Sequence, residues 1–100
     1  MNHSDSAEIT ERIRRIIEME NRYDRISLAL HAASVCPDRL DSIRGDIQAL
    51  SEYYEGSLWR EDFEADEAGL LPPDLKRGVL SEDGVYNLLS EYDMLRQQDT

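Results

Sequence analysis

The feature that most limits the fold is the stretch of residues 8–35, which contains neither glycine nor proline. Within it, apolar side chains recur mostly at intervals of three and four residues, the spacing of one face of an α-helix. These positions are Ile9, Ile13, Ile16, Tyr23, Ile26, Leu30 and Ala33. No part of the chain shows the alternation of apolar and polar residues that is typical of a strand. The sequence therefore predicts an all-α protein whose first element is one long helix.

A second helix is predicted over residues 37–55. Pro37 disfavours helical geometry at the residue before it and suits the first turn of a new helix, so it separates the two elements. Apolar residues then repeat at spacings of three and four, at Leu40, Ile43, Ile47, Leu50 and Tyr54. Because the connection is short, we expect the two helices to lie side by side as a long antiparallel hairpin over residues 8–55.

The stretch from Tyr53 to Leu89 has the most distinctive composition, with the only Trp, Phe and Lys of the chain and four of its five glycines. Ser57 is expected to cap a short acidic helix that ends near Gly69. An apolar, non-helical connector follows at 70–73. A last helix is expected over 82–97, and we expect both helices to pack against the hairpin.

At this length the whole chain, residues 1–100, is expected to form a single helical domain. Residues 1–7 are polar and are predicted to be a disordered leader. The hairpin at 8–55 comes next, and residues 56–97 supply an irregular segment and the C-terminal helix.

Four residues of the distinctive stretch are predicted to be structural anchors. Trp59 and Phe63 are four positions apart and share a helix face, and Tyr86 is expected beside them in the core, because so small a chain needs its aromatic rings as filling. Ser81 precedes two acidic residues and suits the N-cap of the last helix. Glu20, in contrast, is expected at the edge of the first apolar stripe, facing water.

The charge of the chain is uneven. Residues 1–50 hold seven arginines against nine acidic residues, whereas residues 51–100 hold four basic residues against thirteen acidic ones, and the net charge is −11. Such a surface repels nucleic acid and anionic lipid, so neither is expected as a partner. A partner selected by charge is expected to be basic or to be a metal ion.

The sequence favours a cytoplasmic location. Cys36 is the only cysteine, so no internal disulfide can form, which fits a reducing compartment. The first residues lack the basic and apolar regions of a signal peptide, and no apolar run approaches the length that spans a bilayer.

The best candidate for a metal site is the acidic run Glu61, Asp62, Glu64, Asp66 and Glu67. Oxygen-rich clusters bind Mg²⁺ or Ca²⁺, although the spacing here is not that of the known calcium loop. Solvated surface carboxylates are the more common reason for such a run. On that interpretation, replacing Asp62 and Asp66 by asparagine is expected to leave the melting temperature nearly unchanged or slightly raised.

No other pattern predicts chemistry. His3, His31 and Cys36 lack the spacing of a zinc site, and the glycines are too far apart for a phosphate loop. We therefore expect no catalytic residue, no cofactor and no enzyme.

Two functional hypotheses remain open. The first is a non-enzymatic protein–protein interaction module that forms a homodimer through Ile17, Leu28 and Val35, which lie beside the main stripe of the first helix, and that also binds another protein. The second is a small divalent-metal-dependent enzyme or metal-binding regulator that uses the carboxylates of 61–67.

The block WREDFEADEAGLLPPDLKRGVLSEDGVYNLL at 59–89 resembles the domain of unknown function 4298 family of small bacterial proteins. The segment YDRI at 23–26 and the pair Tyr53–Tyr54 are similar as well, and the resemblance covers residues 9–95. The family pattern has glycine directly after the tyrosine pair, whereas Glu55 intervenes here. The resemblance implies a short helical cytoplasmic protein of bacterial origin, and it implies no activity and no catalytic residues.

Overall fold

The computed structural model describes residues 3–33 and 38–98, and every regular element in these ranges is helical. In chain order the elements are α1 (His3–Ala33), α2 (Arg39–Ser42), α3 (Arg44–Glu55), α4 (Ser57–Glu67), the 3₁₀ helix η1 (Gly78–Leu80) and α5 (Glu82–Gln98). The prediction of an all-α fold is confirmed.

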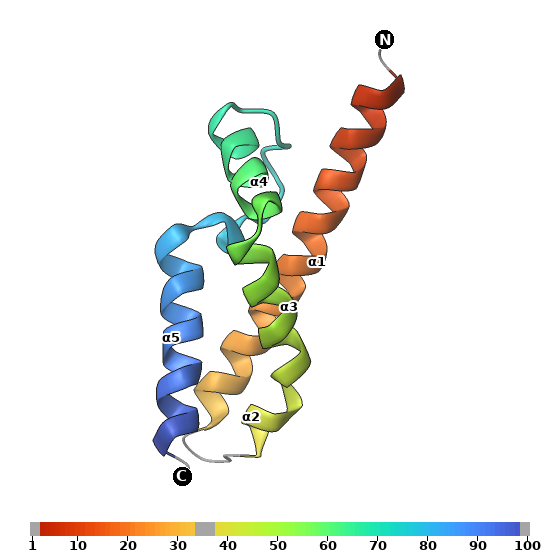
Figure 1. Ribbon diagram of the computed structural model, residues 1–100. Coiled ribbons are helices and arrows are strands. Elements are labelled where there is room, and N and C mark those ends of the chain that lie inside the picture. Colours follow the sequence, from red (N-terminus) through yellow and green to blue (C-terminus); the bar gives the residue numbers. More distant parts are fainter. Residues whose placement is uncertain (1–2, 34–37, 99–100) are drawn as a thin grey trace.

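The long helix α1 is the element that most of the others share as a packing partner (Figure 1). It contacts α2 and α3, which carry the chain back along it, and it also contacts η1 and α5. α4 continues beyond the end of α3 and packs on α3 and η1. The molecule is elongated, with principal extents of 55 × 20 × 17 Å. Within the described residues, no helix combines the length and the apolar character needed to cross a bilayer.

Two helix boundaries differ from the prediction. α1 begins at His3 rather than at Glu8, so the backbone of residues 3–7, expected to be a leader, is helical. The segment that was predicted as one second helix is divided at Ile43, where α2 ends and α3 begins. Pro37, the predicted start of this segment, lies outside the described residues.

A hydrogen bond between a side chain and the backbone accompanies the division at Ile43. The Ser42 hydroxyl donates a hydrogen bond of 2.7 Å to the carbonyl oxygen of Arg39, and short polar side chains of this kind compete with helical hydrogen bonding. The backbone of Ile43 leaves helical geometry, with φ −107° and ψ 9°. Its side chain and that of Leu40 are nevertheless both buried, so the division keeps the apolar seam on the core.

Gly69 ends α4 with a left-handed backbone, φ 74°. The N–H of Gly69 donates to the carbonyl of Asp66 at 3.1 Å, and the N–H of Leu70 donates to the carbonyl of Ala65 at 3.0 Å. These two bonds form the Schellman motif, which satisfies carbonyl groups at a helix end and favours glycine at this position. The predicted end of the acidic helix near Gly69 therefore follows from backbone conformation.

The two predicted serine caps have different outcomes. The Ser81 hydroxyl accepts a hydrogen bond of 3.1 Å from the N–H of Gly84, which is the N-cap arrangement for α5. Gly56, and not Ser57, occupies the N-cap position of α4, and no side chain caps that helix. Ser57 is the first residue of α4 instead.

Trp59 anchors α4 in the core, with only 3% of its surface exposed. Its ring stacks on Phe63 with 5.1 Å between centroids, and it meets the ring of Tyr54 in an edge contact at 5.0 Å. Its indole N–H donates a hydrogen bond of 2.9 Å to the carbonyl oxygen of Val79. The aromatic contacts join α4 to α3, and the hydrogen bond joins α4 to η1.

The expectation that Tyr86 packs in the core is wrong, because 62% of its surface is exposed. The core face of α5 carries Val85, Leu88 and Tyr92, all of them buried. Each residue of an α-helix is rotated by about 100° from the one before it. Tyr86 therefore lies to the side of the face on which Val85 sits.

Ion pairs between α1 and α3 reinforce their packing. Asp46 of α3 accepts hydrogen bonds from Arg22 at 2.9 Å and from Arg25 at 2.8 and 3.1 Å. The hydrogen bond from Arg25 is the main cause that lowers the pKa of Asp46 below its usual value. The carboxylate is therefore stabilised in its charged form by folding.

Truncating Trp59 is expected to destabilise the protein severely. Trp59→Ala removes a buried ring and the bond to Val79, a loss of about 3–5 kcal/mol in the free energy of unfolding. Urea denaturation followed by circular dichroism measures this loss. Tyr86→Ala is the matched control, since its ring is exposed, and equal losses in the two variants would contradict the assignment of Trp59 as the anchor.

Replacing Asp46 is expected to change how stability depends on pH. Because folding lowers the pKa of Asp46, its contribution is present above the unfolded pKa, about 4, and is lost as the pH falls through the lower folded value. The melting temperature of the wild type should therefore fall more steeply below about pH 4 than that of Asp46→Asn. An equal dependence of the melting temperature on pH in the two proteins would show that the pair with Arg25 contributes nothing to the pH dependence of stability.

Candidate functional site

Asp62 of α4 is the centre of a network of ion pairs and hydrogen bonds, and its side chain is completely buried. Arg15 of α1 reaches its two carboxylate oxygens with hydrogen bonds of 2.6 and 2.9 Å. Arg12, one turn earlier on α1, adds a bond of 3.1 Å, and the hydroxyl of Tyr53 in α3 adds one of 2.6 Å. Four donor contacts thus surround one carboxylate and link three helices.

The neighbours of Asp62 hold fixed charges and protons at neutral pH. Burial, followed by the hydrogen bond to Asp62, raises the pKa of Tyr53 far above its ordinary value. The hydrogen bond to Asp62 likewise raises the pKa of Arg15. A general acid or base works best when its pKa lies near the operating pH, and both shifts move away from that range. The network is therefore suited to holding helices together.

The structure does not bring the five acidic candidates together. Asp62 is buried, whereas Glu64 and Glu67 are exposed. Asp66 bonds to Arg77, and Glu61 lies 3.9 Å from Arg12. In residues 3–33 and 38–98, no group of three or more His, Cys, Asp or Glu side chains is placed to hold a metal ion.

The expectation that all these acids are solvated is wrong for Asp62. A signal for its burial was present in the sequence, because Asp62 follows Trp59 by three positions and so shares its helix face. Its partners, Arg12 and Arg15, are also three positions apart, on one side of the α1 stripe. The local spacing does not show, however, that Arg12 and Arg15 contact Asp62.

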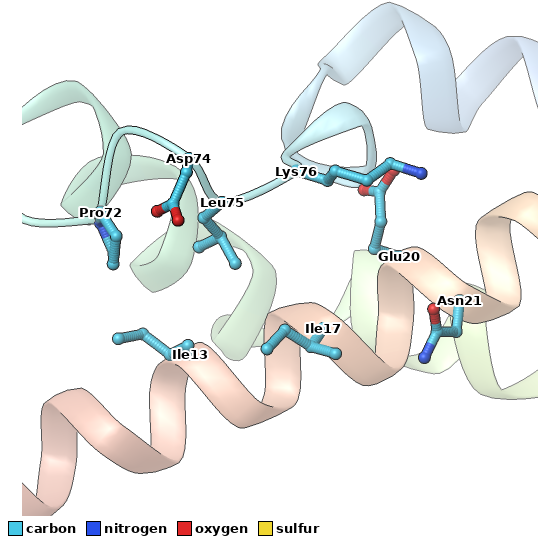
Figure 2. Close-up of a pocket in the computed structure, with 8 residues that line it drawn as sticks. All are labelled: Ile13, Ile17, Glu20, Asn21, Pro72, Asp74, Leu75 and Lys76. Atoms are coloured by element: carbon cyan, nitrogen blue, oxygen red, sulfur yellow. The ribbon is translucent and has the colours of Figure 1, made fainter.

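A groove with a volume of about 370 Å³ lies between α1 and the segment 70–77, which follows α4 and is called the connector from here on (Figure 2). Ile13 and Ile17 of α1 face Pro72 and Leu75 of the connector across it. The remaining lining residues are polar: Glu20, Asn21, Asp74 and Lys76. The groove therefore combines apolar walls with a small set of charged groups.

Glu20 is buried at this groove, which contradicts the expectation that it faces water. Only 6% of its surface is exposed. Its Oε1 accepts a hydrogen bond of 2.9 Å from the N–H of Val79. Gly78 leaves room for the carboxylate, since a Cβ at that position would lie 3.2 Å from Oε2. Gly84 similarly leaves room for Tyr23, whose hydroxyl would be 2.8 Å from an added Cβ.

Arg77 holds the connector in its conformation. Its guanidinium donates to the carbonyl oxygens of Pro72 at 2.5 Å and of Leu75 at 3.2 Å, and it also bonds to Asp66 of α4. The N–H of Leu75 closes the turn by donating to the carbonyl of Pro72 at 3.2 Å. The connector wall of the groove is thus fixed by bonds within residues 66–77.

Removing the charge of Asp62 is expected to destabilise the fold. Asp62→Asn keeps the size of the side chain but leaves Arg12 and Arg15 without their counter-charge. The expected loss is about 3 kcal/mol in the free energy of unfolding, at the lower end for a broken buried pair, because both arginines are partly exposed. Chemical denaturation of Asp62→Asn beside Glu64→Gln, an exposed acid of the same helix, measures the difference. Similar stabilities for the two variants would contradict a structural role for the network.

One family model matches the chain, over residues 16–98, and its description is "Domain of unknown function (DUF4298)". No curated protein and no solved structure matches the chain. The matched range includes Tyr53 and Asp62, the connector and η1, whereas Arg12 and Arg15 of the network lie before it. The chain belongs to the DUF4298 family.

Proposed function

We propose that this protein is a non-enzymatic protein–protein interaction module that associates with a second copy of itself through the outer face of α1. The observation that carries the proposal is the exposure of two large apolar side chains there, 47% for Ile17 and 73% for Leu28. Val35, the third residue expected on this face, lies outside the described residues.

Ile17 and Leu28 share one face of α1. They are eleven positions apart, which corresponds to about three helical turns, so their side chains differ in direction by only about 20°. α5 leaves both of them exposed. Single exposed apolar residues are common on protein surfaces, but two on one face of a long helix give a partner helix two apolar contact points, with the polar residues Asn21 and Asp24 between them.

Each of these side chains borders a hollow. Ile17 forms part of the groove beside the connector. Leu28 borders a second hollow of about 270 Å³, whose lining also includes Ala29 and Ile43 and the polar residues Arg25, Arg39, Ser42 and Asp46. In a twofold dimer the same patch serves both copies, so in the proposed contact each projecting side chain would meet the corresponding face of the partner copy.

A cytoplasmic location is part of the same proposal. The single cysteine excludes an internal disulfide, which fits a reducing compartment. The stability of the fold rests instead on apolar burial and on internal ion pairs such as those of Asp62 and Asp46.

The wild type is expected to form a dimer at micromolar concentration. Light scattering on a sizing column should report twice the 11.5 kDa of one chain. Leu28→Asp should shift the protein to the monomer, because it places a charge in the proposed apolar contact. Ser27→Asp is the matched control, since it adds the same charge at a neighbouring exposed position, and it should remain dimeric.

A monomeric wild type across the concentration series, or equal effects of the two aspartate variants, would contradict self-association. The competing hypothesis of a metal-dependent protein has a separate signature. It requires a melting temperature that rises with Mg²⁺, Ca²⁺ or Mn²⁺ well beyond the effect of NaCl at the same ionic strength. Such a rise would replace the proposal of an interaction module.

A further inference from the structure

We propose that the groove between α1 and the connector binds a lysine or arginine side chain of a partner protein, with the aliphatic stem between the apolar walls and the positive charge at Glu20. This inference rests on the proposed role as an interaction module, but it does not depend on self-association. The partner is a protein segment with an exposed basic residue.

The apolar walls fit the stem of such a side chain. Ile13 and Ile17 lie on one side, and Pro72 and Leu75 lie on the other (Figure 2). The volume of about 370 Å³ is at the small end for ligand pockets, a size suited to one or two side chains. Lysine and arginine bury their methylene groups along apolar surfaces while their charged ends remain in polar surroundings.

The charge at the groove selects a cation. Glu20 is 6% exposed, and its only hydrogen bond is the one that Oε1 accepts from Val79. Its Oε2 accepts no hydrogen bond from the described residues, and the carboxylate lies at the groove lining, where its charge also acts on the ammonium of Lys76. A buried carboxylate with an unused oxygen is stabilised when a cation binds it.

The other charged groups around the groove also favour a cation. Asp74 lines it, is exposed and forms no ion pair within the described residues. Lys76 is the one cation in the lining, and its ammonium already bonds to Asp24 at 3.0 Å. The lining itself thus holds two carboxylates, Glu20 and Asp74, and one ammonium that is already paired with Asp24, which leaves an excess of negative charge at the groove.

The walls favour an organic cation over a metal ion. Four of the eight lining residues are apolar. No group of three or more metal-ligating side chains occurs among the described residues, so the oxygen cage that Mg²⁺ or Ca²⁺ requires is missing from this part of the chain. The bonds of Arg77 to the connector carbonyls hold the groove open in advance, which reduces the cost of ordering it on binding.

The test uses n-hexylammonium as a probe, with n-hexanol and hexanoate as neutral and negative analogues of the same length. Each is titrated into ¹⁵N-labelled full-length protein at pH 7 while amide signals are followed by NMR. Hexylammonium should shift the signals of Asn21, Leu75 and Val79. It should bind at least about tenfold more tightly than hexanol, and hexanoate should bind most weakly.

Glu20→Gln keeps the shape of the side chain and its acceptor for the Val79 N–H, and it should remove the preference for the cation. Asp74→Asn, an exposed change that leaves the fold unaltered, should reduce the preference more modestly. Glu64→Gln removes one negative charge from an exposed position on α4 that does not line the groove, and it should leave the preference for the cation intact. Leu28→Asp should also retain it, so a failure of self-association remains distinguishable from a failure of this inference.

Three outcomes would overturn the inference: absence of localised shifts with hexylammonium, equal affinities for the three probes, or a preference that survives Glu20→Gln. The inference would also be overturned if the amide signals of the groove residues shifted with protein concentration in the absence of a probe. A second copy of the protein would then occupy the groove.

Discussion

The carboxylate of Asp62 is the constraint on which the rest of the arrangement depends. It draws Arg12 and Arg15 from α1 and Tyr53 from α3 onto one residue of α4. A buried charge is tolerated only when donors converge on it, so this residue excludes arrangements in which α4 is rotated or shifted along α1. Packing alone is less selective, because apolar side chains tolerate many neighbours of similar size.

The position of α4 is transmitted to the groove through one residue, Val79. Trp59 of α4 donates to the carbonyl oxygen of Val79, and the N–H of the same residue donates to Glu20 of α1. Val79 is itself completely buried, so neither bond competes with water. The Asp62 network therefore fixes α4, α4 fixes η1, and η1 holds the Glu20 carboxylate beside the connector.

Features set by local chemistry could be predicted from the sequence, whereas features set by pairing across the chain could not. Helical spacing predicted the all-α class, and the serine and glycine positions predicted the start of α5 and the end of α4. The roles of Asp62 and Glu20 depend on partners 47 and 59 positions away, which no local pattern specifies. Tyr86 shows the opposite error, because its aromatic character favours burial but its direction on α5 leaves it exposed.

The internal ion pairs also explain how an acidic chain presents two different surfaces. Arginines of α1 are engaged by Asp62 and Asp46, so much of the positive charge is used within the fold. Thirteen of the 22 acidic residues lie in residues 51–100. In the proposed dimer, salt is expected to strengthen the contact between the two copies by screening their net charge of −11 each. The proposed binding of a cation at the groove is expected to respond in the opposite way, since screening weakens the attraction of Glu20 and Asp74 for a cation, and ionic strength would therefore separate the two kinds of association.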